Sequence, residues 1–405
     1  PAHQRDLEEA PGPGGGDQQG AGRVGGDGVM AKKHVNITQV CSEIFAGGDA
    51  PKDRMSTQPT PEYKVPVYSN GEDNDGLYGY TDFARVTSPS ITVSARGTIG
   101  YTSIRNEPFV PIVRLITITP IPEIVDIRYL YYVIKNYNFK GSGTSIPQLT
   151  VPMLKTYKFP LPSLDEQRSI AAVLDKVSGL IAKRREQLDK LDELVKARFV
   201  EMFGDLVIGD KICSNKHKIG EIASVTKLAG FEFTKYIHYT EQGDIIMLRG
   251  LNCKKGHLVL DDIKWIDKKT SDLLPRSKLY YGDILMTYAG TIGDVAMVDE
   301  DDKYHLAPNV AKISLNNKSN CNPVFLLHLF MYSNDYIMTF ASQVAQASIN
   351  MEKIRNFEYY FPAVELQNQF VSFVSQTDKS KLTIQQSLDK LKVLQKALRQ
   401  QYFGG

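Results

Sequence analysis

The chain has 405 residues, 42% of them hydrophobic and 23% charged, and its formal net charge is +2. This length suffices for two or three domains with separate cores, and no apolar run reaches the roughly 18 residues of a transmembrane helix. Because the charge is nearly balanced, composition excludes a chain that is basic throughout, and any surface for an acidic partner has to be local.

The first 29 residues differ in composition from the rest of the chain. Nine of them are Gly and few are large and apolar, so they cannot bury enough surface to offset the entropy of ordering. We predict that residues 1–29 are a disordered leader or an added extension.

The segment 30–160 is predicted to be a β-rich domain. The expected elements are strands over 91–96 and 113–118, a Gly97-Thr98-Ile99-Gly100 turn after the first strand, and helical spacing over 128–137. The domain closes at Phe159-Pro160-Leu161-Pro162, where two prolines block regular structure.

A long helix is predicted over 161–206. Ser163 followed by Glu166 fits a capping box at its start, and Gly204 is a typical C-terminal stop. Its apolar positions alternate in steps of four and three, which indicates a coiled-coil seam. The seam residues are Ile170, Leu174, Val177, Ile181, Leu188, Leu191 and Val195, with Arg184 and Arg198 at further seam positions. At ~1.5 Å per residue, about 40 residues make a rod of about 60 Å.

The second half of the chain repeats this plan. Residues 207–362 are again β-rich, with a strand over 283–289 that ends at a Gly290-Thr291-Ile292-Gly293 turn. A second helix is predicted over 363–405 with the same four-three spacing. Its seam residues are Phe370, Val374, Ile384, Leu388, Leu391 and Leu398, with Lys381 and Gln395 at further seam positions.

The repeat is visible residue by residue. Phe159-Pro160 aligns with Phe361-Pro362 at an offset of 202, whereas Leu188-Asp189-Lys190-Leu191 and Phe203-Gly204 recur at an offset of 200. Between residues 100 and 145 the two copies barely match.

Two seams in one chain favour packing of the long helices on each other, and the domain between them allows an antiparallel pair. The sequence therefore predicts an α+β chain with two β-rich domains separated by an antiparallel coiled coil. The alternative is that both are simply long core helices. A spacer between two similar but divergent domains suits two separated sites on DNA, where half-sites lie ~34 Å apart per helical turn.

At these residues the chain resembles the specificity subunit of a type I restriction-modification enzyme. The resemblance rests on Phe159 to Gln167 entering a long helix, Phe203-Gly204 ending it, and a weaker second copy from Phe361-Pro362 to Gly404. Gly282-Asp283-Ile284-Leu285 and the two Gly-Thr-Ile-Gly turns also match. In the second copy, residues 364–369 depart from the family pattern because a second Pro and a Glu-Gln pair are missing.

The resemblance implies two target-recognition domains, each reading one half of a bipartite double-stranded DNA site. It implies that the helix pair sets the spacer and docks subunits that methylate adenine with S-adenosylmethionine, and that an ATP- and Mg²⁺-dependent restriction subunit can join. The chain itself would bind no cofactor and carry no catalytic site.

The sequence agrees with a non-catalytic role, since it contains neither a phosphate-binding loop nor a dinucleotide fingerprint. Asn322-Pro323-Val324-Phe325 faintly resembles an amino-methyltransferase motif, but a helix-starting turn is the better interpretation. The acids at 299–302 are interpreted as a solvated loop. The four cysteines have no metal or disulfide spacing, which favours a reduced, cytoplasmic setting: Cys41, Cys213, Cys253 and Cys321.

Candidate DNA contacts are polar side chains in loops that could reach phosphates or base edges. In the first domain they are Arg96, Thr98, Ser142, Thr144, Ser145 and Gln148. In the second domain they are Arg249, Asn252, Lys254, Lys255, Tyr288, Thr291, Gln343, Gln346 and Ser348. At each position a solvated polar loop, or for Tyr288 a packed strand residue, is the competing interpretation.

Two other functions remain open at this point. One is the specificity chain of a fused restriction-methylation system that lacks a motor subunit. The other is a coiled-coil scaffold that gathers proteins without reading DNA.

Overall fold

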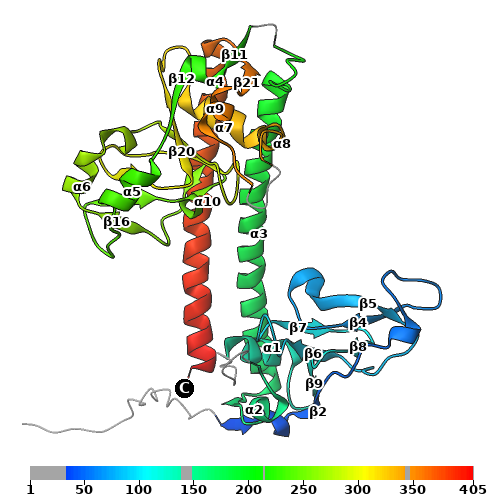
Figure 1. Cartoon of the computed structure of the whole chain (residues 1–405). Helices are drawn as coiled ribbons and strands as arrows, with labels where there is room; N and C mark the ends of the chain where they lie inside the picture. Colours follow the sequence, from blue (N-terminus) through cyan, green and yellow to red (C-terminus); the bar gives the residue numbers. More distant parts are fainter. Residues whose placement is uncertain (1–32, 138–147, 213–214, 343–346, 405) are drawn as a thin grey trace, which may run out of the picture. The chain divides into compact units, whose positions relative to one another are not determined.

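The computed structural model describes residues 33–137, 148–212, 215–342 and 347–404, and the chain divides into two compact units (Figure 1). The first unit comprises Pro1–Leu174 and Leu398–Gly405, and the second comprises Asp175–Ala397. Each unit is described separately below. Five predicted site residues lie outside the described residues, namely Ser142, Thr144, Ser145, Gln343 and Gln346, as do the predicted leader and Cys213.

The first unit contains two sheets and a short strand pair. One sheet has the order β2-β9-β6-β7 and the other the order β3-β5-β4-β8, while β1 pairs with β10. The strands are β1 His34–Asn36, β2 Cys41–Ala46, β3 Met55–Ser56, β4 Val65–Tyr68, β5 Leu77–Thr81, β6 Ser90–Val93, β7 Thr102–Arg105, β8 Val110–Pro111, β9 Ile116–Pro120 and β10 Lys158–Pro160. Short 3-10 turns are η1 Ile37–Gln39, η2 Lys52–Arg54 and η3 Asp73–Gly76.

Helices cover the β2-β9-β6-β7 sheet and carry the core of the first unit. They are α1 (Ile127–Asn136), α2 (Val151–Lys155) and the first residues of α3 (Leu164–Phe203). Asp126 caps α1, and the fully buried Tyr129 of α1 donates to the Pro160 carbonyl at 2.6 Å. The Tyr129 ring also meets Phe403, with centroids 5.6 Å apart. The end of α10 (Val364–Phe403) therefore docks on this domain.

The second unit contains a sheet of the matching order, β12-β20-β17-β18. A sheet of order β16-β13-β19, the hairpin β14-β15 and the pair β11-β21 accompany it. The strands are β11 Lys216–Lys218, β12 Ala223–Lys227, β13 Ile245–Leu248, β14 Cys253–Lys254, β15 His257–Leu258, β16 Lys264–Ile266, β17 Ile284–Thr287, β18 Val295–Met297, β19 Tyr304–Leu306, β20 Val310–Leu315 and β21 Glu358–Tyr360.

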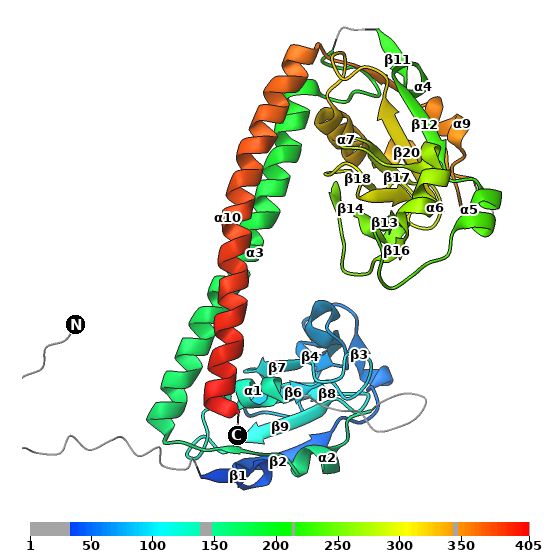
Figure 2. The ribbon, with the colours of Figure 1, turned by 90° about the vertical axis from the view of Figure 1, so that its left-hand side faces the viewer.

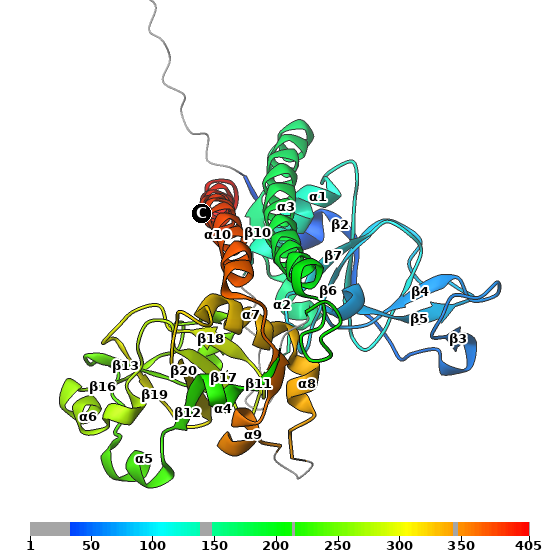
Figure 3. The ribbon, with the colours of Figure 1, turned by 90° about the horizontal axis from the view of Figure 1, so that it is seen from above.

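The helices and turns of the second unit are short apart from the long pair. They are α4 Ile219–Ile222, α5 Gly230–Tyr236, α6 Lys268–Leu273, α7 Pro323–Tyr332, α8 Asn334–Met338, α9 Met351–Arg355, η4 Gly250–Asn252 and η5 Pro275–Ser277. In Figure 3, α7 lies between the sheet and the long helices. Its Phe325 ring lies 5.8 Å from that of Phe199 on α3 and 5.2 Å from that of Phe203. These rings form the centre of the core of this unit.

The structure revises how the two copies align. Phe159 pairs with Val35 in the β1–β10 ladder, and Tyr359 pairs with His217 in the equivalent β11–β21 ladder. Gln167 Nε2 donates to the Pro162 carbonyl at 2.9 Å, and Gln367 Nε2 donates to the Pro362 carbonyl at 2.8 Å. The alignment of Phe159-Pro160 with Phe361-Pro362 is therefore wrong by two residues, because the tertiary equivalents from β10 and β21 into the long helices are 200 apart. Pro362 and Gln367 are the second Pro and the Gln that the second copy was predicted to lack.

The buried glutamines explain why this position is common to both copies. Gln167 Oε1 accepts from the Asp126 backbone N–H at 2.8 Å, and Gln367 Oε1 accepts from the Asn322 N–H at 2.9 Å. Asp126 and Asn322 cap α1 and α7, respectively. Each glutamine thus links the start of a long helix to the capped helix of its own domain.

The predicted coiled-coil seam is confirmed. Within the second unit α3 and α10 lie side by side (Figure 2), and Gln395 Nε2 donates to Ser178 Oγ at 2.9 Å while Lys381 pairs with Asp192 at 2.6 Å. Asp192 lies 14 residues after Ser178 on α3, whereas its partner Lys381 lies 14 residues before Gln395 on α10. The pair is therefore antiparallel. Every predicted seam residue is buried or half-buried, including the polar Arg184, Arg198, Lys381 and Gln395.

Most other predicted elements are confirmed, with two corrections. The strands at 91–96 and 283–289 are found as β6 and β17, and the helix at 128–137 as α1. The predicted strand over 113–118 begins only at Ile116, because Val113 and Arg114 form a turn with positive φ of 51° and 62°. Pro160 does not block regular structure, since it ends strand β10. Ser163 Oγ accepts from the Glu166 N–H at 3.4 Å, which is one half of the predicted capping box.

Candidate functional site

The repeated Gly-Thr-Ile-Gly turns have the same backbone geometry. Gly97 and Gly100 adopt φ of 75° and 87°, and Gly290 and Gly293 adopt 83° and 86°, a region where glycine has no steric penalty. The Gly100 N–H donates to the Ser94 carbonyl at 2.9 Å, and the Gly293 N–H donates to the Thr287 carbonyl at 2.9 Å. Each turn places an exposed threonine, Thr98 or Thr291, at the end of a buried strand.

A second loop packs against this turn in both copies. The Leu149 N–H donates to the Ala95 carbonyl at 2.9 Å, and the Ile349 N–H donates to the Tyr288 carbonyl at 2.9 Å. The structure therefore brings the predicted residues Arg96, Thr98 and Gln148 together in the first domain. In the second domain it brings together Tyr288, Thr291 and Ser348. The copies differ in chemistry here, because Ala289 bridges to Ser348 where the first domain has Arg96 and Gln148.

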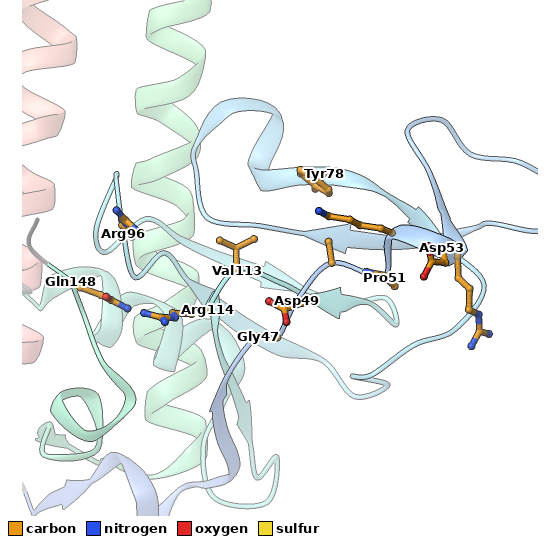
Figure 4. A pocket seen from close by; sticks show the side chains of 13 residues that line it. Gly47, Asp49, Pro51, Asp53, Tyr78, Arg96, Val113, Arg114 and Gln148 are labelled. Carbon is orange, nitrogen blue, oxygen red and sulfur yellow. The ribbon is translucent and has the colours of Figure 1, made fainter.

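In the first domain this region borders a hollow of about 1070 Å³ (Figure 4). Its lining comes from the segment after β2, from β5 and from the loop before α2. It also includes Arg96, beside the Gly-Thr-Ile-Gly turn, and the turn at Val113 and Arg114. The lining residues are Gly47, Gly48, Asp49, Ala50, Pro51, Lys52, Asp53, Arg54, Tyr78, Arg96, Val113, Arg114 and Gln148. Figure 4 shows the side chains of Gln148 and Arg114 pointing toward one another.

The hollow carries an excess of positive charge. Four of its side chains are cationic and two are carboxylates. Arg54 pairs with Asp82 at 2.7 Å, whereas Lys52, Arg96 and Arg114 are exposed and form no ion pair with the described residues. A local cationic surface can therefore exist in a chain whose net charge is only +2.

Three lining residues that sequence reasoning missed are Arg114, Val113 and Tyr78. Val113 is 53% exposed and Tyr78 is 52% exposed. A β-branched residue at positive φ is a backbone outlier that costs on the order of 1–3 kcal/mol, and such strain clusters at functional sites. No local pattern indicates this strain, because Val113 precedes an apolar run that is typical of a strand.

Hydrogen bonds hold the turn at Val113 against this strain. The Val113 N–H donates to the Gly48 carbonyl at 2.8 Å and the Arg114 N–H donates to the Gly47 carbonyl at 3.0 Å. Asn70 Nδ2 donates to the Val113 carbonyl, while Asn70 Oδ1 accepts from the Ala95 N–H at 2.7 Å. Asn70 thereby ties this turn to the Gly-Thr-Ile-Gly turn.

Asp75 ties the β4–β5 loop to the β6–β7 hairpin. Its carboxylate accepts from Tyr101 Oη at 2.9 Å, from Ser103 Oγ at 2.5 Å and from the buried Arg105 guanidinium at 2.5 Å. Burial alone would raise the pKa of Asp75, but the hydrogen bonds from Ser103 and Tyr101 and the charge of Arg105 lower the pKa below its usual value. Charge-assisted bonds thus hold the β4–β5 loop against the β6–β7 hairpin.

The predicted basic loop of the second domain is only partly available to a ligand. Asn252 is fully buried, and its amide donates to the carbonyls of Val259 and Asp262 at 2.8 and 2.9 Å. Arg249 pairs with Asp262 at 2.7 Å. The Asn252 amide is therefore used inside the fold, and Asn252 as a DNA contact stays a prediction from the sequence.

Lys254 and Lys255 are exposed on the β14–β15 hairpin. Lys255 and Gly256 adopt φ of 48° and 85°, which fits a two-residue turn. Tyr288 is half-buried, its hydroxyl accepts from the Asn309 N–H at 3.3 Å, and its ring lies 5.6 Å from Lys227 Nζ. Tyr288 is therefore a packed strand end with one face against a cation.

Asn322 caps α7 by accepting from the Val324 N–H at 3.0 Å, which agrees with a helix-starting turn. In the part of the chain that the structure describes, no group of three His, Cys, Asp or Glu could hold a metal ion. Over the same residues, no helix is long and apolar enough to cross a membrane.

A sequence model of a known domain family matches this chain twice. The sequence model described as "Type I restriction modification DNA specificity domain" matches residues 32–192 and again residues 214–393. The two matches together cover most of the chain and correspond to its two halves.

Individual relatives agree. A Mycoplasma pneumoniae protein described as type I specificity subunit S.MpnORF89P is 35% identical over 164 residues, which are 40% of this chain and 48% of that protein. The EcoBI specificity subunit of Escherichia coli is 27% identical over 278 residues, 62% of this chain and 58% of that protein. The chain thus spans about half the length of these curated relatives.

Solved structures share the fold. The S subunit of a type I restriction-modification system from M. genitalium superposes with a TM-score of 0.53 at 17% identity, covering 93% of this chain and 97% of that one. A chain from a structure of complex assembly in a type I restriction-modification system gives a TM-score of 0.55 at 14% identity, with 93% and 98% coverage.

Proposed function

The chain belongs to the family of type I restriction-modification DNA specificity proteins, and we propose that it is the subunit that selects the DNA sequence in such a complex. Each domain would read one half of a bipartite duplex site. The observation that carries the proposal is the duplication of one frame that has different side chains, exposed or half-buried, at the same place in each copy. Arg96 and Gln148 in one copy occupy the positions of Ala289 and Ser348 in the other.

The candidate contacts in the first domain are the cationic and polar side chains around the hollow. Arg96, Arg114 and Gln148 can reach phosphates or the acceptor edges of bases, since arginine and glutamine form bidentate pairs with guanine and adenine. The candidates in the second domain are Lys254, Lys255, Thr291 and Ser348, all exposed or half-buried. Ser142, Thr144, Ser145, Gln343 and Gln346 stay in the proposal on sequence grounds alone.

The partners follow from the same assignment. We infer that adenine methyltransferase subunits dock on the helix pair, and that S-adenosylmethionine, ATP and Mg²⁺ are bound by partner subunits rather than by this chain. Its work on DNA would take place in the cytoplasm. The five-part division of the chain at residues 29, 160, 206 and 362 stays a prediction.

Methylome sequencing tests the proposal. Deleting the gene from its source strain should remove one bipartite methyladenine motif, and re-expression should restore it. Retention of every such motif in a strain without a second specificity gene would overturn the assignment.

A substitution then tests the site. Arg96→Ala should weaken selection within one half of the motif, by about 1–3 kcal/mol at a single base pair if the contact is bidentate. Lys64→Ala, in an exposed segment that does not line the hollow, is the matched control and should leave the motif unchanged.

A further inference from the structure

We propose that Val113 is a specificity-determining residue of the first domain, and that it reads the C5 methyl group of a thymine in its half-site. The inference rests on the proposed function and adds to it a named contact and a named DNA group. It starts from a side chain that is apolar, exposed and held on a strained backbone.

Hydrogen bonds hold the turn at Val113 in its strained backbone conformation. Three hydrogen bonds fix it, from the Val113 N–H to Gly48, from the Arg114 N–H to Gly47, and from Asn70 Nδ2 to the Val113 carbonyl. Gly47 is itself required, because a Cβ there would lie 2.6 Å from the Pro111 carbonyl carbon. Glycine or asparagine would adopt the positive φ at 113 more easily, so valine has to be explained by its side chain.

The surroundings of Val113 indicate what that side chain meets. Figure 4 shows it between Arg114 and Asp49, with Arg96 and Gln148 on one side of the hollow. Arginine and glutamine are the side chains that read guanine and adenine edges in the major groove, and the thymine methyl is the one apolar group exposed there. An isopropyl group among such side chains matches that methyl in chemistry.

The alternative of a wedge in the minor groove is less suitable. Residues that unstack bases are typically longer or flatter, such as Phe, Leu, Ile, Met and Pro. A minor-groove wedge would also be insensitive to the C5 methyl group, which lies in the major groove, so the two can be separated by experiment.

In the second domain the residue equivalent to Val113 is a proline rather than a valine. The Ile112 N–H donates to the Tyr68 carbonyl at 2.8 Å, and the equivalent Ala307 N–H donates to the Leu248 carbonyl at 3.2 Å. By this equivalence Pro308 occupies the place of Val113, and Asn309, at φ 69°, occupies the place of Arg114. Methyl sensitivity that depends on residue 113 should therefore be confined to one half-site.

The test uses the full chain in complex with the modification subunit of its source organism. Once the methylome has defined the motif, a series of duplexes replaces each of its thymines, one at a time, by deoxyuridine. For the wild-type complex one such replacement in one half-site should weaken binding about fourfold, the value of one buried methyl group. For Val113→Ala the same replacement should have no further effect.

Val113→Asn separates a reading role from a structural one. It should raise the thermal stability of the first unit, because asparagine fits the left-handed turn, while it abolishes the methyl sensitivity. If Val113 had only a structural role, Val113→Asn would not lose discrimination between thymine and deoxyuridine, and no such loss would be confined to one half-site.

The outcomes are distinguishable. Identical deoxyuridine profiles for the wild-type complex and Val113→Ala, with specific binding intact, would overturn this inference and leave the proposed function standing. Absence of any sequence-specific binding by the wild-type complex would overturn both.

Discussion

The two units dock their domains on the long helices with different side chains. In the second unit Phe199, Phe203, Phe325 and Phe370 pack ring against ring, with centroids 4.9 to 5.8 Å apart. In the first unit the equivalents of Phe199 and Phe370 are Arg399 and Ile170, which are not aromatic, and the ring of Phe403 packs against that of Tyr129.

The contrast indicates which parts of the duplicated frame can vary between the copies. Backbone ladders, the buried glutamines and the Gly-Thr-Ile-Gly turns are kept in both units, because they fix the direction in which each domain presents its loops. The side chains that fill the space between helix and domain differ, because many apolar sets reach the same packing density.

The largest expected effect is on the feature that both units share. Leu188→Asp together with Leu391→Asp should destabilise the helix pair by on the order of 5 kcal/mol or more, since each places a charge in the seam. Circular dichroism against temperature measures the loss, and methylation of both half-sites should disappear. Wild-type assembly of the double mutant would contradict the coiled-coil seam.

The second prediction compares the two aromatic anchors. Phe203→Ala should cost about 3–5 kcal/mol in the second unit, whereas Phe403→Ala should cost less because its ring has fewer aromatic neighbours and is slightly exposed. Hydrogen exchange measured on peptides from each unit localises each loss. Leu382→Ala, at an α10 position that is 61% exposed, is the control and should be near neutral. Equal losses of stability for Phe203→Ala and Phe403→Ala would contradict the difference between the two units in how a domain packs on the helices.

The third prediction concerns the glutamine links. Gln167→Ala and Gln367→Ala should each cost about 1–3 kcal/mol, because each leaves buried backbone groups without a partner. The two costs should be alike, which thermal denaturation of the two variants can check. A loss at only one position would show that the frame is not equivalent in both copies.

The smallest effect is a pH dependence that arises at Asp75 in the first unit. Because the folded-state pKa of Asp75 is lowered, its contribution to stability is present above the unfolded pKa and is lost as the pH falls through the folded pKa. Acid titration of the wild-type chain and of Asp75→Asn should show a smaller acid loss in the variant. Since half of the Asp75 side chain is exposed, solvent screening keeps the effect small. Parallel titration curves would contradict the role of Asp75.

Much of the architecture follows from the sequence alone. The four-three spacing from Ile170 to Val195 and from Phe370 to Leu398 determined a coiled-coil seam, because side chains at that spacing share one face of a helix whatever their partner. The two Gly-Thr-Ile-Gly stretches determined equivalent turns, because glycine permits the positive φ that the geometry needs.

The alignment of the two copies and the composition of the site depend on contacts between residues far apart in the chain. Phe159 is equivalent to Tyr359 because the two residues occupy the same position in their strand pairs. A strand pair joins residues far apart in the chain, so a local sequence match with Phe361-Pro362 cannot detect it. From the sequence Asn252 is predicted to be a polar loop residue, whereas in the structure its amide donates to carbonyls inside the fold. The hollow brings Val113, Arg114 and Tyr78 next to Arg96 and Gln148 because loops distant in sequence converge on one face, and such convergence is set by packing rather than by any local pattern.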